Sequence, residues 1–142
     1  MTTTPRKQSI LIVEDDEAVR SALRRTLVRE GYEVREAREG GAALKLLASA
    51  PSDLVITDMI MPDMEGIALI IALRKDRPKL PVIAISGGGR VGMNNYLGIA
   101  EGCGASRVLA KPFQAKQILA FVQELLGPPP PPPPGASTAP NP

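Results

Sequence analysis

Five short apolar runs alternate along the chain with segments of helical periodicity, and this alternation restricts the fold more than any other feature. The runs cover residues 10–13, 32–34, 54–56, 82–85 and 108–110. Each is short enough to be a β-strand. Apolar residues recur at helical spacing in residues 17–30, 41–50, 66–75 and 114–126, and more weakly in residues 94–101. Regular βα alternation with short connections predicts an α/β fold, in which a parallel sheet has helices on both faces.

The polarity of the runs predicts which strands are central. The first, third and fourth runs are continuously apolar, as expected for strands that are covered on both faces. Apolar and charged residues alternate in residues 32–36, and the fifth run is short and follows Ser106 and Arg107, so both are expected at sheet edges. We therefore predict a doubly wound, flavodoxin-like sheet of five strands in the order 2-1-3-4-5. Ligands of such sheets bind at the carboxyl ends of the strands, here beside strands 1 and 3.

Proline is concentrated near the C-terminal end of the chain. Of 15 prolines in 142 residues, nine lie within residues 127–142 and seven are consecutive, at positions 128–134. This segment has no charged residue and too little apolar surface to offset the entropy of ordering it, so we expect a polyproline II or disordered tail. After a flexible N-terminus of residues 1–8, residues 9–126 are long enough for one domain with its own core.

The residue types that are missing exclude several kinds of chemistry. The chain has no histidine and one cysteine, which excludes an imidazole base, a His/Cys zinc site and an internal disulfide. The near balance of 17 basic and 15 acidic residues, with two tyrosines, two phenylalanines and no tryptophan, argues against nucleic-acid binding. There is no signal-peptide pattern and no apolar run near the roughly 18 residues of a membrane helix. We therefore expect a cytoplasmic protein without a membrane partner.

Carboxylates follow two neighbouring strands of the predicted sheet. Glu14, Asp15 and Asp16 come directly after the first run, and Asp58 ends the third strand. Neighbouring strands lie about 4.8 Å apart, so these like charges would share one crevice, where a bound cation would relieve their repulsion. A site made only of oxygen ligands suits Mg²⁺. Asp16 stands directly before the first helix, and we expect it to cap that helix rather than to bind metal.

Two further polar residues are expected at the same edge of the sheet. Strand 4 ends at Ser86, and strand 5 leads into Lys111. A hydroxyl donor and an ammonium group beside a cation and the Asp58 carboxylate would form a set that can hold a phosphoryl group. Alone, either residue has an ordinary explanation as a loop serine or a solvated lysine, so the prediction depends on the whole set.

The motifs ILIVEDD, DLVITDMIMPDMEG, PVIAIS and VLAKPF occur in this order within residues 9–126. With these motifs the chain resembles the receiver domain of two-component response regulators. The resemblance implies that Asp58 accepts a phosphoryl group from a histidine kinase or a histidine phosphotransfer protein. It also implies that Mg²⁺ is held by Asp15, Asp58 and the carbonyl group of Ile60, with Glu14 acting through water.

The same resemblance assigns roles to the remaining polar residues at this edge of the sheet. Ser86 and Lys111 would each bind a phosphoryl oxygen, and the Lys111–Pro112 peptide bond would be cis. The domain would be a signalling module rather than an enzyme, with its output surface on the fourth helix, strand 5 and the last helix. Because residues 127–142 stand where response regulators usually carry an output domain, we expect a stand-alone receiver that signals through a separate effector protein.

Several positions depart from the family pattern. Val108 occupies the place of the usual aromatic residue on strand 5, so rotation of an aromatic ring cannot report phosphorylation. Three glycines at 87–89 predict a mobile loop after strand 4. Ile60 and Gly88 offer no polar side chain that could orient a water molecule, and we therefore expect slow self-dephosphorylation. Cys103, between two glycines, is expected to be a small packing residue.

Two other functions remain open at this point. Gly87, Gly89 and Gly92 form a G-x-G-x-x-G pattern after a predicted strand, as in dinucleotide-binding folds, but no acidic residue follows roughly 20 residues later to bind a ribose. A phosphatase of the haloacid dehalogenase type would also use an aspartate nucleophile. Its D-x-D signature is absent, since Met59 and Ile60 follow Asp58. Binding of NAD or turnover of a phosphate ester would support these alternatives.

Overall fold

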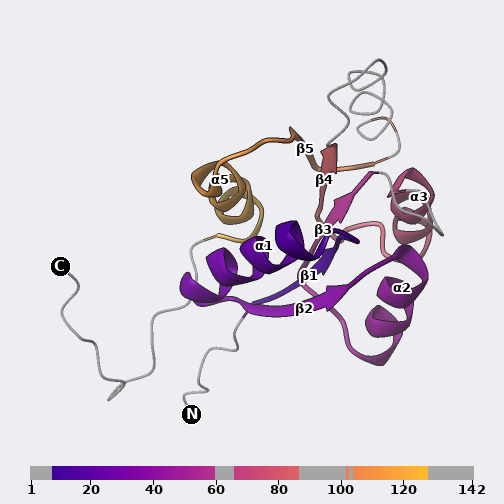
Figure 1. Cartoon of the computed structure of the whole chain (residues 1–142). Coiled ribbons are helices and arrows are strands. Elements are labelled where there is room, and N and C mark those ends of the chain that lie inside the picture. The colour runs from indigo at the N-terminus through magenta and orange to yellow at the C-terminus, as the bar shows by residue number, and fades with distance from the viewer. Residues whose placement is uncertain (1–7, 60–65, 87–101, 103, 128–142) are drawn as a thin grey trace, which may run out of the picture.

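The computed structural model contains one parallel sheet with helices on both faces (Figure 1). It describes residues 8–59, 66–86, 102 and 104–127. The strands are β1 (Ser9–Val13), β2 (Glu33–Ala37), β3 (Leu54–Asp58), β4 (Val82–Ser86) and β5 (Arg107–Ala110). Their order is β2-β1-β3-β4-β5, and every neighbouring pair is parallel. The predicted fold class and strand order are confirmed.

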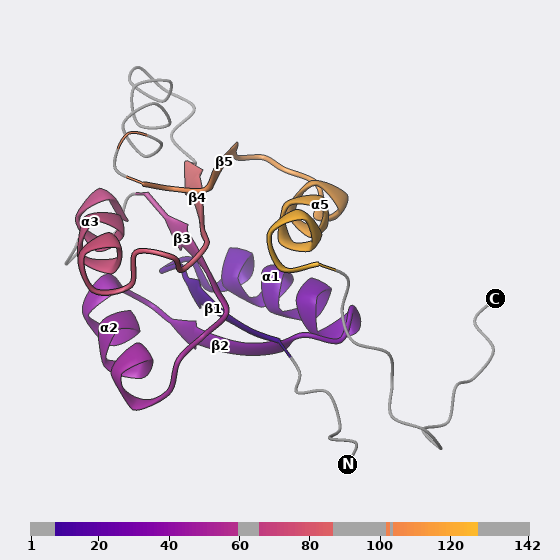
Figure 2. The same cartoon turned by 180° about the vertical axis from the view of Figure 1, so that it is seen from behind.

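The helices form two layers, one on each face of the sheet. They are α1 (Glu17–Arg29), α2 (Gly40–Ser49), α3 (Gly66–Asp76) and α5 (Ala115–Leu126). The pairs α1/α5 and α2/α3 lie on opposite faces, as the two opposite views show (Figures 1 and 2). The helical ranges that we expected between residues 17 and 126 agree with these bounds to within one residue at each end, apart from residues 94–101, which lie outside the described residues.

Alternate residues of the central strands supply the two halves of the core. Leu11 and Val13 of β1 face the α2/α3 layer, whereas Ile10 and Ile12 face the α1/α5 layer. All five residues of β1, β3 and β4 are buried, which explains why the runs at residues 10–13, 54–56 and 82–85 within these strands are continuously apolar. The edge strand β2 is partly exposed, and its charged side chains can therefore reach solvent.

Strand β2 differs from its expected extent. The second apolar run predicted a strand at residues 32–34, but β2 is Glu33–Ala37 and Tyr32 precedes it. The strand is longer because β1 pairs with it along its whole length, from Ser9 with Glu33 to Val13 with Ala37. Pairing with the buried strand β1 therefore extends β2 through the charged residues Arg35 and Glu36, which lie beyond the apolar run.

Several sequence-based expectations concern residues outside the described part of the chain. They are the N-terminal residues 1–7, Ile60, the glycine loop with Gly87, Gly88, Gly89 and Gly92, Cys103, and the proline-rich residues 128–142. In the part of the chain that is described, no helix is long and apolar enough to cross a lipid bilayer.

Candidate functional site

Three carboxylates meet at the carboxyl ends of β1 and β3. Oxygen atoms of Glu14, Asp15 and Asp58 lie within 4.8 Å of one another. Glu14 is 1% exposed and Asp58 is 7% exposed, whereas Asp15 is open to solvent. The structure thus brings together the three acidic side chains that the sequence analysis placed at one crevice, and it leaves one of them accessible from outside.

Backbone pairing explains why these side chains converge. Val13 of β1 is paired with Thr57 of β3, so the residues that follow each of them, Glu14 and Asp58, lie at the same level of the sheet. The chain stays paired just beyond the strands: Glu14 N donates to Ala37 O at 3.0 Å, and Met59 N donates to Ile85 O at 2.8 Å. The acidic residues are therefore carried by the rigid sheet.

Asp16 behaves as the cap of α1, as predicted. Its side chain accepts hydrogen bonds from the backbone N–H groups of Ala18 and Val19, at 2.9 and 3.2 Å. These bonds satisfy donors that have no partner within the helix. The Asp16 N–H in turn donates to Glu14 Oε2 at 3.1 Å, so the capping residue also orients one of the three clustered carboxylates.

Lys111 extends into this acidic cluster from the end of β5. Its Nζ atom donates to Glu14 Oε1 at 2.9 Å and lies 3.9 Å from Asp58 Oδ1. Its backbone N–H donates to Ser86 O at 2.8 Å, which ties it to the end of β4. The Lys111–Pro112 bond is cis, as the family resemblance implied. The lysine is therefore a partly buried ion-pair partner rather than a solvated surface residue.

Burial and neighbouring charges shift two titrating groups. Desolvation by burial, reinforced by the charge of Asp58, raises the pKa of Glu14 above its usual value, although the hydrogen bond from Lys111 opposes this shift. For Lys111, burial lowers the pKa, but the hydrogen bond to Glu14 and the charges of Asp58, Glu14 and Asp16 together outweigh it and raise the pKa. The lysine therefore stays charged at neutral pH.

The backbone around Asp58 is packed closely against the start of α3. Met59 N donates to Asp58 Oδ1 at 2.9 Å, and Gly66 N donates to Met59 O at 2.8 Å. A Cβ atom on Gly66 would stand 2.2 Å from Asp58 O, a distance at which the atoms overlap. Sequence reasoning did not identify Gly66, since nothing in the local sequence shows that this helix start meets the backbone of Asp58.

Ser86 is the last residue of β4 and is completely buried. Its Oγ atom has no hydrogen-bond partner among the residues that the structure describes. A buried hydroxyl group without a partner is costly and uncommon, and such groups often mark functional positions. Val108, the residue at the usual aromatic position, is partly buried against the core on the α2/α3 face.

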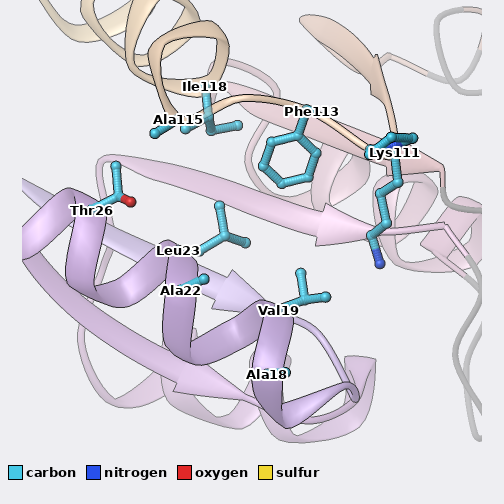
Figure 3. A pocket seen from close by; sticks show the side chains of 10 residues that line it. Ala18, Val19, Ala22, Leu23, Thr26, Lys111, Phe113, Ala115 and Ile118 are labelled. Carbon is cyan, nitrogen blue, oxygen red and sulfur yellow. The ribbon is translucent and has the colours of Figure 1, made fainter.

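An apolar groove begins beside Lys111 and runs between α1 and α5 (Figure 3). Its volume is about 630 Å³. The lining residues are Ala18, Val19, Ala22, Leu23 and Thr26 from α1, Lys111, Pro112 and Phe113 from the segment that leads into α5, and Ala115 and Ile118 from α5 itself. In Figure 3, Lys111 lies at one end of this group, so the groove adjoins the acidic cluster.

The chain matches the model of a known protein family. The family model of the response regulator receiver domain matches residues 10–123. The chain belongs to this family. Receiver domains are the signalling modules of two-component systems, and the predicted family membership is thus confirmed. The match includes all the acidic residues of the cluster and the segment that carries Ser86 and Lys111.

Individual relatives agree with this assignment. The chain is 38% identical over 117 residues to the response regulator MprA of Mycolicibacterium vanbaalenii, a match that spans 82% of this chain and 49% of MprA. It is 36% identical over 120 residues to the DNA-binding transcriptional regulator NtrC of a Bradyrhizobium species, over 83% of this chain and 24% of NtrC. The chain therefore spans a quarter to a half of the length of these relatives.

Solved structures support the same fold. A CheY-like receiver domain protein from Methanospirillum hungatei superposes with a TM-score of 0.76 at 29% identity, covering 84% of this chain and 93% of that one. The receiver domain of NtrX from Brucella abortus gives a TM-score of 0.77 at 30% identity, covering 82% and 97%. Both matches cover nearly all of the compared receiver domain.

Proposed function

We propose that Asp58 is the phosphoryl acceptor of this receiver domain, in a Mg²⁺-dependent transfer from a histidine kinase or a histidine phosphotransfer protein. One observation supports this most directly: the oxygen atoms of Glu14, Asp15 and Asp58 lie within 4.8 Å of one another, beside an ammonium group 3.9 Å from Asp58. Carboxylates alone would suggest only a cation site. The lysine beside one of them adds a second group that can hold a phosphoryl oxygen.

The donor set fits Mg²⁺. Glu14, Asp15 and Asp58 offer only oxygen ligands, and the exposed position of Asp15 leaves room for the water molecules that Mg²⁺ retains. When bound, the cation would neutralise charge on the transferring phosphoryl group. Glu14 and Asp15 would hold it from β1 and Asp58 from β3. The Ile60 carbonyl group, which the family resemblance adds to this set, remains a prediction.

The chain's own residues have defined roles in the transfer. A carboxylate oxygen of Asp58 forms a bond to phosphorus, while the bond between phosphorus and the donor's imidazole nitrogen breaks and leaves its electron pair on that nitrogen. The Lys111 ammonium group and the Ser86 hydroxyl donate hydrogen bonds to phosphoryl oxygens. Since both groups are held by the sheet, the protein contributes mainly positioning and electrostatic stabilisation.

The groove between α1 and α5 supports a protein as the phosphoryl donor. It is apolar and adjoins Lys111, so a donor helix with an apolar face can pack there while its histidine reaches Asp58. Downstream, we propose that the phosphorylated domain acts on an effector protein through the β5/α5 side. The separate effector, the slow self-dephosphorylation and the cytoplasmic location stay predictions.

Neither alternative function gains support from a described residue. The glycine pattern of the dinucleotide hypothesis lies at Gly87, Gly89 and Gly92, outside the described residues. The phosphatase hypothesis shares Asp58 but lacks a second aspartate two positions later. Titration with NAD and turnover of a phosphate ester remain the measurements that would favour them.

Beryllofluoride, which mimics an acyl phosphate, tests the proposed function. We expect it to bind the wild-type protein in the presence of Mg²⁺, with chemical-shift changes at Ser86 and Lys111 in NMR spectra. The Asp58→Ala variant should show none of these changes, and neither should wild type in EDTA. Equal binding by wild type and Asp58→Ala would overturn the site assignment.

A further inference from the structure

Arg20 of α1 is a buried cation to which the proposed transfer assigns no role. Its side chain is only 10% exposed. Nη1 donates to the backbone carbonyl oxygen of Glu14 at 2.9 Å, and Nε donates to Glu36 Oε1 on β2 at 3.2 Å. Arginine is seldom this buried unless it is paired, and here both bonds lead to the acidic loop or to the strand beside it.

The carbonyl group that Arg20 binds belongs to the peptide unit that joins Glu14 to Asp15. These two residues are two of the three that cluster at the cation site. The other side of this loop is also fixed, because Glu14 N donates to Ala37 O at 3.0 Å and Arg20 N donates to Asp16 O at 2.9 Å. Arg20 is therefore the side chain that holds the central peptide of the acidic loop against the body of the domain.

We propose that Arg20, with its charge balanced by Glu36, is a positioning residue for the cation site. It holds the Glu14–Asp15 peptide so that both carboxylates point at one metal ion. This inference rests on the Mg²⁺ dependence proposed above. It adds that the affinity of the site is set in part by a guanidinium group that touches neither the ion nor the phosphoryl group.

The chemistry of Mg²⁺ makes such positioning important. This ion requires near-ideal octahedral geometry, and groups that orient metal ligands typically contribute about 10- to 100-fold to metal affinity. The balancing charge matters as well. Without Glu36, the Arg20 guanidinium would place an uncompensated positive charge close to a cation site.

Arg24 provides a matched control on the same helix. Its Nε atom lies 3.5 Å from Glu36 Oε2, so it shares an acidic partner with Arg20, but its side chain is 43% exposed. Among the described residues, the side chain of Arg20 donates a hydrogen bond to the backbone of the acidic loop, at Glu14 O, and the side chain of Arg24 donates none to it. Loss of Arg24 therefore removes a similar charge near the same glutamate without releasing the Glu14–Asp15 peptide.

The test is calorimetric titration of the full chain with MgCl₂. We expect Arg20→Met to bind Mg²⁺ about tenfold more weakly than wild type, and Arg24→Met to stay within about twofold. Urea unfolding of each variant verifies that the titrated protein is folded. If Arg20→Met does not fold, Arg20→Lys and Glu36→Gln are used instead. Arg20→Lys keeps the charge but cannot bond to Glu14 O and Glu36 at once, and it should bind Mg²⁺ more weakly than wild type. Glu36→Gln should also weaken Mg²⁺ binding, because it leaves the charge of Arg20 uncompensated.

A second readout separates positioning from general support of the fold. Phosphoryl uptake from acetyl phosphate by Arg20→Met should recover at high Mg²⁺ concentration, with its half-saturating concentration raised by the same factor as the Kd. A lower unfolding free energy with unchanged Mg²⁺ affinity would overturn the inference and leave the proposed function intact. Absence of Mg²⁺ binding by the wild type would instead overturn the proposed function itself.

Discussion

The two halves of the site differ in how completely their polar atoms are paired. In the acidic half, at the ends of β1 and β3, Glu14 accepts hydrogen bonds from Lys111 and from Asp16 N, and Asp58 accepts one from Met59 N. In the other half, at the end of β4, the buried Ser86 Oγ has no partner among the described residues. The acidic half is thus formed before any ligand arrives, whereas the hydroxyl group of the second half is available to one.

This difference suggests that the acidic half binds the cation and that the β4 half responds to the phosphoryl group. Carboxylates that are already held by the backbone lose little freedom when a cation binds, which favours a stable metal site. A buried hydroxyl without a partner gains a hydrogen bond only when a phosphoryl oxygen reaches it. We therefore expect phosphorylation to change the β4 side more than the β1 and β3 side, and the following predictions test that asymmetry.

The largest expected effect comes from breaking the support of the acidic half. In Gly66→Ala the new Cβ would overlap Asp58 O, so the start of α3 or the backbone of Asp58 must move. We expect a loss of about 2 kcal/mol in the free energy of unfolding, together with weaker Mg²⁺ binding. Urea unfolding and calorimetry measure the two effects.

Gly102→Ala is the matched control for this substitution. Apart from its own chain neighbours and helix backbone, no atom of the described residues lies within 4 Å of the position that its Cβ would take. A loss of stability as large as that of Gly66→Ala would show that the close approach to Asp58 is not the cause.

The next largest effect concerns the unpartnered hydroxyl group. Ser86→Ala removes no hydrogen bond that the structure describes, so we expect the free energy of unfolding in EDTA to stay the same or to rise. Beryllofluoride affinity should nevertheless fall about tenfold, or about 1.4 kcal/mol, because one donor to the phosphoryl mimic is lost. Ser86→Ala should therefore lower beryllofluoride affinity without lowering the free energy of unfolding.

Ser106→Ala serves as the contrasting variant. Ser106 precedes β5 and lies beside Val82, at the start of β4, whereas Ser86 is at the end of β4. Its Oγ accepts a hydrogen bond from Val82 N at 3.2 Å, so its loss should lower stability by about 1 kcal/mol and leave beryllofluoride affinity unchanged. If the two serine variants behaved alike in both measurements, the hydroxyl group of Ser86 would have no special role.

The smallest effect is electrostatic. Because the folded state raises the pKa of Glu14, this residue favours folding when it is protonated, and that contribution is lost as the pH rises through the raised pKa. Glu14→Gln should therefore unfold at a higher urea concentration than wild type at about pH 7 in EDTA. The difference should disappear below about pH 4, where the unfolded glutamate is protonated too.

An exposed glutamate gives a control of opposite sign. The hydrogen bond from Arg107 lowers the pKa of Glu124, so the ionised form of Glu124 favours the folded state. Glu124→Gln should slightly reduce stability at neutral pH. A gain in both variants would point to a general effect of net charge rather than to the burial of Glu14.

Much of this molecule could be predicted from its sequence, for identifiable reasons. Strands buried on both faces have to be continuously apolar, so β1, β3 and β4 were visible as runs, and their order placed Glu14, Asp15 and Asp58 at one edge. Asp16 was recognisable as a cap because capping depends on local sequence.

The features that were missed depend on contacts between distant segments. The extension of β2 to Ala37 depends on pairing with β1, and the constraint at Gly66 depends on where α3 meets the backbone of Asp58. An arginine within a helix, such as Arg20, is expected to be exposed. Its burial becomes visible only when the acidic loop and Glu36 are placed beside it.

Intact-protein mass spectrometry measures phosphoryl transfer to Asp58 directly. Wild-type protein incubated with acetyl phosphate and Mg²⁺ should gain the mass of one phosphoryl group, which peptide mapping places on Asp58. The gain should be absent in EDTA and in Asp58→Ala. A phosphoryl group that forms equally well on Asp58→Ala, or without a divalent cation, would contradict the account.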